Sequence, residues 1–126
     1  MAYAYTDAEF LEGSLFPGSQ TPNVPHNSAN AFASMAWDEN WQTNLNIYAQ
    51  GDRFADLANT TVLPGYVTVD LTQAYAFTLG GNPFELQLNV RNLFDEDYFA
   101  GSHLHVSRYI MPGKPRTFSV SAMYRF

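Results

Sequence analysis

An alternation of apolar and polar residues with a period of two is the feature that most constrains the fold of this chain. Successive side chains of a β-strand point to opposite faces, so such a segment has one apolar and one polar face. The pattern is clearest in residues 41–51, where one face carries Trp41, Thr43, Leu45, Ile47 and Ala49 and the other carries Gln42, Asn44, Asn46, Tyr48 and Gln50. These eleven residues are close to the ~9–11 of a tilted strand that crosses a membrane.

Five further segments are expected to be strands. Four of them follow the same pattern, one with a weaker alternation of small residues, and in the first neither face is clearly apolar. The five segments are residues 2–10, 28–37, 66–77, 85–92 and 117–126. Two residues break the pattern, because Gln73 falls on an apolar face and Met123 on a polar one. No segment shows a helical period over ten or more residues. The sequence therefore predicts an all-β fold, an antiparallel up-and-down meander of about six strands.

Short and long connections alternate between the expected strands. The short ones are residues 38–40 and 78–83, which are rich in turn-forming residues. The long ones are residues 11–27, 53–65 and 93–116. In an up-and-down sheet this alternation places all the short turns on one rim, as in outer-membrane barrels.

Aromatic residues gather at both ends of the expected strands. At the short-turn rim are Trp37, Trp41, Tyr75, Phe77, Phe84, Tyr124 and Phe126, and at the opposite rim are Phe54, Tyr66 and Phe118. Two aromatic girdles around an apolar band are typical of a transmembrane barrel. We therefore expect a partial transmembrane β-barrel whose apolar faces contact outer-membrane lipid.

Charge and composition exclude several classes of protein. Charged residues make up 14% of the chain, against about 25% in ordinary soluble domains. The alternative fold is a soluble all-β sandwich that acts as a binding module, but its polar faces would normally carry Lys and Glu rather than Asn, Gln, Ser and Thr. The formal net charge of −6 disfavours a nucleic-acid partner. With no cysteine, disulfides and thiolate metal sites are excluded.

Several short motifs resemble those of one known family. Residues 90–98 read V-R-N-L-F-D-E-D-Y, which is similar to the N-L-F-D-x-x-Y signature near the end of TonB-dependent receptors. As in that family, P-G-K-P-R-T at 112–117 and a closing Y-R-F at 124–126 follow. Upstream, N-V-P-H at 23–26, G-D-R-F at 51–54 and L-P-G-Y at 63–66 resemble its final strands.

The resemblance implies a place within a much larger protein. Receptors of this family are barrels of about 22 strands, closed by an N-terminal plug and energised through TonB. Residues 1–126 are then the C-terminal part of such a barrel, without plug, signal peptide or earlier strands, and TonB would be reached only through that missing N-terminal part. The implied function is uptake of a ferric siderophore or a similar scarce nutrient across the outer membrane.

Two groups of residues are candidates for function. By resemblance, Phe126 with Tyr124 and Phe118 forms the terminal aromatic signal read by the outer-membrane assembly machinery, although these rings could also simply anchor the strand in lipid. His103, His105 and Arg108 lie in the longest connection and could contact an anionic ferric chelate. The two histidines have no third metal ligand at a recognisable spacing, so solvated loop residues are expected rather than a metal site.

Catalytic motifs are missing from the sequence. There is no G-x-S-x-G, no H-E-x-x-H and no phosphate-binding glycine loop. An outer-membrane enzyme would need a paired nucleophile and base, which no motif supplies. We therefore expect neither an enzyme nor a cofactor.

Overall fold

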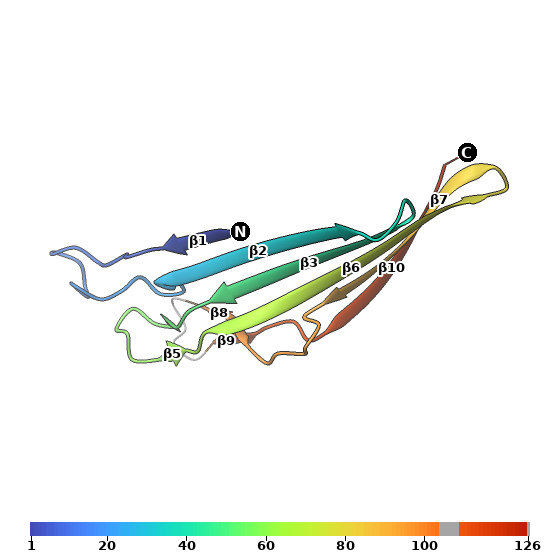
Figure 1. Ribbon diagram of the computed structural model, residues 1–126. Helices are drawn as coiled ribbons and strands as arrows, with labels where there is room; N and C mark the ends of the chain where they lie inside the picture. The colour runs from blue at the N-terminus through green and yellow to red at the C-terminus, as the bar shows by residue number, and fades with distance from the viewer. Residues whose placement is uncertain (104–108, 126) are drawn as a thin grey trace. The chain divides into compact units, whose positions relative to one another are not determined.

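The computed structural model describes residues 1–103 and 109–125, and β-strands are the regular elements in these ranges (Figure 1). Six strands form one antiparallel sheet in the order β1-β2-β3-β6-β7-β10, which confirms the predicted six-stranded meander. They are β1 (Ala2–Tyr5), β2 (Asn27–Ala36), β3 (Trp41–Gln50), β6 (Tyr66–Leu79), β7 (Asn82–Arg91) and β10 (Thr117–Tyr124). Within those two ranges, no helix has the length and apolarity that crossing a membrane requires.

Two predicted boundaries were wrong. The first strand ends at Tyr5 rather than at residue 10, and beyond it Glu9 makes only an isolated bridge with Gln20. The predicted six-residue link 78–83 is a two-residue turn, because Gly80 and Gly81 adopt φ values of 61° and 87°. Two consecutive positive φ values match the right-handed twist of a hairpin, so pairing continues to the turn.

Four short strands lie inside the long connections and were not predicted. Strand β4 (Arg53–Phe54) pairs with β5 (Val62–Leu63), and β8 (Phe99–Ser102) pairs with β9 (Ile110–Pro112). Segments of two to four residues are too short to show a period of two. Their pairing gives the connections 53–65 and 93–116 an ordered base.

The apolar faces of the long strands are not buried in a protein core. Among the residues that the structure describes, the buried hydrophobic ones are Ala55, Leu63 and Val90. Trp41, Leu86 and Leu88 are 44%, 43% and 38% exposed, respectively. A soluble sandwich would bury these side chains between two sheets, so the alternative fold is wrong.

The chain divides into two compact units. The loop unit consists of Met1–Asn30, Tyr48–Val67 and Asp97–Lys114, and it contains β1, β4, β5, β8 and β9. The strand unit consists of Ala31–Ile47, Thr68–Glu96 and Pro115–Phe126, and it contains β7, β10 and most of β2, β3 and β6. Each unit has its own polar network.

Aromatic rings form a continuous row in the strand unit. Trp41 contacts Tyr75 edge-on with ring centroids 5.3 Å apart, and Tyr75 lies 5.7 Å from Phe77. Phe77 lies 4.8 Å from Phe84, its partner in the β6–β7 pairing, and Phe84 lies 6.3 Å from Tyr124, its partner on β10. The row therefore joins four neighbouring strands at their short-turn ends.

Candidate functional site

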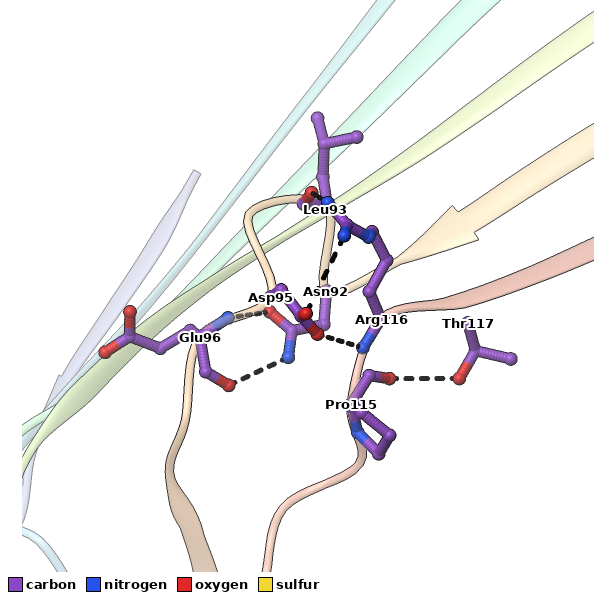
Figure 2. Close-up of polar contacts among 7 residues, drawn as sticks. All are labelled: Asn92, Leu93, Asp95, Glu96, Pro115, Arg116 and Thr117. Carbon is purple, nitrogen blue, oxygen red and sulfur yellow. Dashed lines mark hydrogen bonds and ion pairs between the residues drawn. The ribbon is translucent and has the colours of Figure 1, made fainter.

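The N-L-F-D signature forms a turn that is closed by the side chain of Asn92 (Figure 2). Asn92 has a φ of 51° and is 4% exposed. Its Oδ1 accepts a hydrogen bond from the backbone N–H of Glu96, and its Nδ2 donates to the carbonyl of the same residue, both at 2.9 Å. Asparagine tolerates the left-handed conformation better than most residues with a β-carbon. The side chain thus satisfies two backbone groups that the turn leaves without a strand partner.

The same turn fixes the start of the last strand. Asp95 accepts a hydrogen bond from the backbone N–H of Arg116 at 2.8 Å, and its second oxygen lies 3.7 Å from the Arg116 guanidinium (Figure 2). The two side chains of this ion pair are 43% and 48% exposed, so the ion pair contributes at most about 1 kcal/mol. The backbone hydrogen bond is the more specific constraint, because it places residue 116 at the point where β10 begins.

Strand β6 holds the other side of the turn. The backbone N–H of Leu93 donates to the carbonyl of Val69 at 2.7 Å, and the N–H of Asn92 donates to Oδ1 of Asp70 at 2.9 Å. The sequence analysis did not single out Asp70, so its role as a partner of the signature was missed. The signature therefore ties together the ends of β6 and β7 and the start of β10.

Two further asparagines, both in the loop unit, form the same pair of side-chain hydrogen bonds to one backbone residue. Asn23 and Asn59 have φ values of 62° and 56°. Asn23 exchanges hydrogen bonds of 2.9 and 3.0 Å with the N–H and carbonyl of Ser102. Asn59 exchanges bonds of 2.6 and 3.0 Å with the N–H and carbonyl of Gln20. In the described part of the chain, three of the four non-glycine residues with positive φ thus form hydrogen bonds with both the N–H and the carbonyl of one other residue.

A buried arginine joins separate segments of the loop unit. Arg53 is 2% exposed, its Nη2 donates to the carbonyl of Phe99 at 2.6 Å, and its guanidinium lies 5.7 Å from the ring centroid of Tyr66. When the amide oxygen of Gln50 faces the guanidinium, it accepts from Nε and Nη1 of Arg53 at 3.2 and 3.3 Å. The Gln50 nitrogen then donates to the hydroxyls of Tyr48 and Tyr66, both at 3.0 Å. The network links β4 to β8 through one side chain.

The tyrosine and glycine of the family-like motifs meet in the loop unit. The ring of Tyr98 stacks on Tyr66 with centroids 4.2 Å apart, and the N–H of Gly113 donates to the carbonyl of Tyr98 at 2.6 Å. A β-carbon at position 113 would overlap the Tyr98 ring. Glycine at position 113 is therefore required by the close approach of that ring.

Hydrogen bonds within connection 53–65 change the acidity of one carboxyl group. Desolvation raises the pKa of Asp56, but hydrogen bonds from the backbone and hydroxyl of Thr60 and the backbone of Thr61 lower it by more. The three bonds measure 3.0, 3.1 and 2.8 Å. The net pKa lies below the ordinary value of 3.8, because the bonds favour the charged form.

We expect the loop around Asp56 to open in acid. A carboxyl group with a lowered pKa contributes stability that is present above its unfolded pKa of 3.8 and is lost as the pH falls through the folded pKa. Amide exchange at Thr60 and Thr61, corrected for intrinsic rates, should accelerate as the pH falls from 3.8 into the more acid range. In Asp56→Asn, the corrected rates should be fast throughout and should not change over that range. A wild-type profile as flat as that of the variant would contradict the assignment.

The candidate residues from the sequence are distributed over both units. Tyr124 ends β10, and its hydroxyl accepts a hydrogen bond from Asn82 at 2.9 Å. Phe118 is 65% exposed, and the Arg116 guanidinium lies 5.9 Å from its ring centroid. His103 is exposed in the loop unit, where its N–H donates to the carbonyl of Tyr109 at 3.0 Å. His105, Arg108 and Phe126 lie outside the described residues.

No metal-binding cluster of three or more His, Cys, Asp or Glu residues occurs in the ranges that the structure covers. The ordered polar groups of each unit are those of the turns and loop bases described above. Sequence reasoning found the signature residues but missed Asp70, Asn59 and the network of Arg53.

A family model matches most of the chain. It describes the β-barrel of TonB-dependent receptor-like proteins and covers residues 1–93. The chain belongs to the TonB-dependent receptor β-barrel family. Members of this family are outer-membrane proteins, and the family is one of receptors and transporters rather than enzymes. The resemblance found in the short motifs is confirmed.

Individual relatives support the same assignment. The chain is 33% identical to the metal-pseudopaline receptor CntO of Pseudomonas aeruginosa over 126 aligned positions, which cover 95% of this chain and 17% of the receptor. It resembles the crystal structure of the ferric citrate transporter FecA with a TM-score of 0.83 and 30% identity, over 98% of this chain and 20% of that one. BauA, the ferric preacinetobactin receptor of Acinetobacter baumannii, has a TM-score of 0.83 and 25% identity, over 97% of this chain and 18% of that one. The chain thus spans less than a fifth of the length of the curated relatives that it resembles over nearly its whole length.

Proposed function

We propose that residues 1–126 are the C-terminal part of the barrel of an outer-membrane receptor that takes up a ferric siderophore or a similar scarce nutrient. The observation that carries this proposal is the likeness over 95% of the chain to a receptor named for a metal-pseudopaline complex. The likeness over 98% of the chain to a ferric citrate transporter supports the same substrate class. TonB would act through an N-terminal part of the whole receptor.

The long connections are the part of this segment that would face the ligand. Their bases are ordered by the bonds of Asn23, Asn59 and Arg53, which leaves the residues beyond them to vary with the ligand. His103, His105 and Arg108 belong to the longest connection, and an imidazole or a guanidinium there would bind an anionic chelate. Ligand contact by these three residues is part of the proposal.

The final strand would serve the insertion of the receptor into the membrane. Phe118 and Tyr124 are exposed, at 65% and 44%, on a strand that pairs with β7. Together with Phe126 they would form the aromatic signal that the outer-membrane assembly machinery recognises by strand addition. The same rings would then lie against outer-membrane lipid.

Uptake of radioactive iron tests the receptor function. Deleting the coding segment for residues 1–126 from the organism that carries it should abolish accumulation of one ferric chelate from a panel during iron starvation. Uptake of the other chelates should remain, because a receptor of this kind discriminates between ligands. Equal uptake of every chelate and metal complex in the panel by deleted and parental cells would contradict the proposal.

A further inference from the structure

A polar cluster interrupts the apolar face of the strand unit. It consists of Trp37, Trp41, Thr43 and Gln73, and is called the Gln73 cluster below. Gln73 lies directly opposite Leu88 of β7, and its neighbour Tyr75 on the same face of β6 lies opposite Leu86. The amide of Gln73 therefore has apolar side chains of β7 beside it.

The hydrogen bonds of the cluster fix the orientation of the Gln73 amide. Trp41 Nε1 donates to Gln73 Oε1 at 2.8 Å, and Thr43 Oγ1 donates to the same oxygen at 2.9 Å. The Thr43 hydroxyl in turn accepts from Trp37 Nε1 at 2.7 Å. Because an indole N–H can only donate, the atom of Gln73 that faces Trp41 must be the oxygen.

The amide nitrogen of Gln73 is left with two N–H groups for a partner outside the cluster. Within residues 1–103 and 109–125, no acceptor is placed on this nitrogen, and the residue is half-buried. A donor on a hydrocarbon-facing surface is unfavourable unless the surroundings supply an acceptor. The amide N–H groups of Gln73 therefore require an oxygen acceptor that is not part of the described chain.

The position of the two indole rings indicates where that acceptor comes from. Trp41 is the first residue of β3, and Trp37 and Trp41 are 64% and 44% exposed. Exposed indole rings at the ends of membrane strands settle at the level of the lipid head groups. At that depth the phosphodiester group is the strongest hydrogen-bond acceptor of the surroundings.

We propose that the Gln73 cluster is a binding site for a phospholipid head group. The amide nitrogen of Gln73 donates to a phosphodiester oxygen, and the rings of Trp37 and Trp41 lie beside the glycerol and the upper acyl chains. The hydrogen bonds from Trp41 and Thr43 hold the amide so that its nitrogen faces the lipid. This site is independent of the ligand that the receptor transports.

Intrinsic fluorescence tests the site directly, because Trp37 and Trp41 are the two tryptophans of the chain. The full chain in non-ionic detergent micelles is titrated with phosphatidylglycerol that carries brominated acyl chains, or with diacylglycerol that carries the same chains. Half-maximal quenching should occur at an about tenfold lower mole fraction of the phospholipid, as expected for one hydrogen bond to a charged oxygen. Equal quenching by both lipids would overturn the site. Quenching by neither would overturn both the site and the placement of this face in lipid.

A charge-matched pair of variants gives a second measurement. Gln73→Glu keeps an oxygen for Trp41 and Thr43 but replaces the donating nitrogen with a second oxygen, which repels phosphate. The tenfold preference should disappear in this variant. Gln42→Glu makes the same change on the opposite face of β3 and should keep the preference. Retention of the preference in Gln73→Glu would overturn the proposal, and the two-lipid comparison on the unchanged chain decides it even if that variant fails to fold.

Discussion

Asn92→Ala is expected to lower the free energy of unfolding of the chain by about 3 kcal/mol. The substitution removes the two 2.9 Å hydrogen bonds to Glu96 from a residue that is 4% exposed, a loss of about 1 kcal/mol for each bond. It also leaves alanine at a φ of 51°, which adds about 1 kcal/mol of backbone strain. Urea titration of the chain in detergent micelles, followed by tryptophan fluorescence, measures the change.

Asn92→Gly separates the two contributions. Glycine adopts a positive φ without strain, so this variant should lose only the hydrogen bonds, about 2 kcal/mol. Alanine should therefore be worse than glycine at position 92. At Asn40, an exposed residue without positive φ, the order should reverse, because glycine there only increases the entropy of the unfolded chain. Equal losses for both variants at position 92 would show that backbone conformation plays no part.

The strands of the sheet could be predicted because their signal is local. Apolar and polar residues alternate over eight or more residues in β3, β7 and β10, and the alternation reflects the geometry of each strand alone. The short strands β4 and β8 leave no such trace, since two to four residues cannot show a period. The turn at Gly80 and Gly81 is shorter than predicted because Pro83, a residue type that is common in turns, is the second residue of β7.

The site was less predictable because its partners are far apart in the sequence. Asn23 pairs with Ser102, 79 residues away, and Asn59 pairs with Gln20, 39 residues away. A local pattern cannot record such a pairing. Asn92 was recognised through the family-like signature, but that signature does not reveal which backbone groups the side chain binds. Gln73, by contrast, could be recognised from the sequence, because it is an amide on an otherwise apolar strand face. Such an exception to the pattern indicates a functional or structural role.

Arg53→Met is expected to lower the free energy of local opening of the loop unit by about 3 kcal/mol. Arg53 is 2% exposed, and its guanidinium supplies the hydrogen bonds to the Phe99 carbonyl and the Gln50 amide oxygen. Methionine fills part of the volume but leaves both acceptors without a donor, and an unsatisfied buried acceptor costs about 1–3 kcal/mol. Amide exchange in β4, β5 and β8 should accelerate about 100-fold, because each 1.4 kcal/mol corresponds to about a factor of ten.

The pattern of exchange across the loop unit tests whether Arg53 is the link between β4 and β8. Arg91→Met removes the same charge from an exposed position at the end of β7 and should leave exchange in the loop unit unchanged. Arg53→Lys keeps the charge but cannot reach the Phe99 carbonyl and the Gln50 oxygen together, because lysine presents a single ammonium group, so its effect should be intermediate. If Arg53→Met accelerated exchange in β4 and β5 but not at Phe99–Ser102, the guanidinium would stabilise its own hairpin only. Connections 53–65 and 93–116 would then be held together by Ser102 instead. Ser102 bonds with Asn23, and its hydroxyl donates to the carbonyl of Ala55 at 2.6 Å.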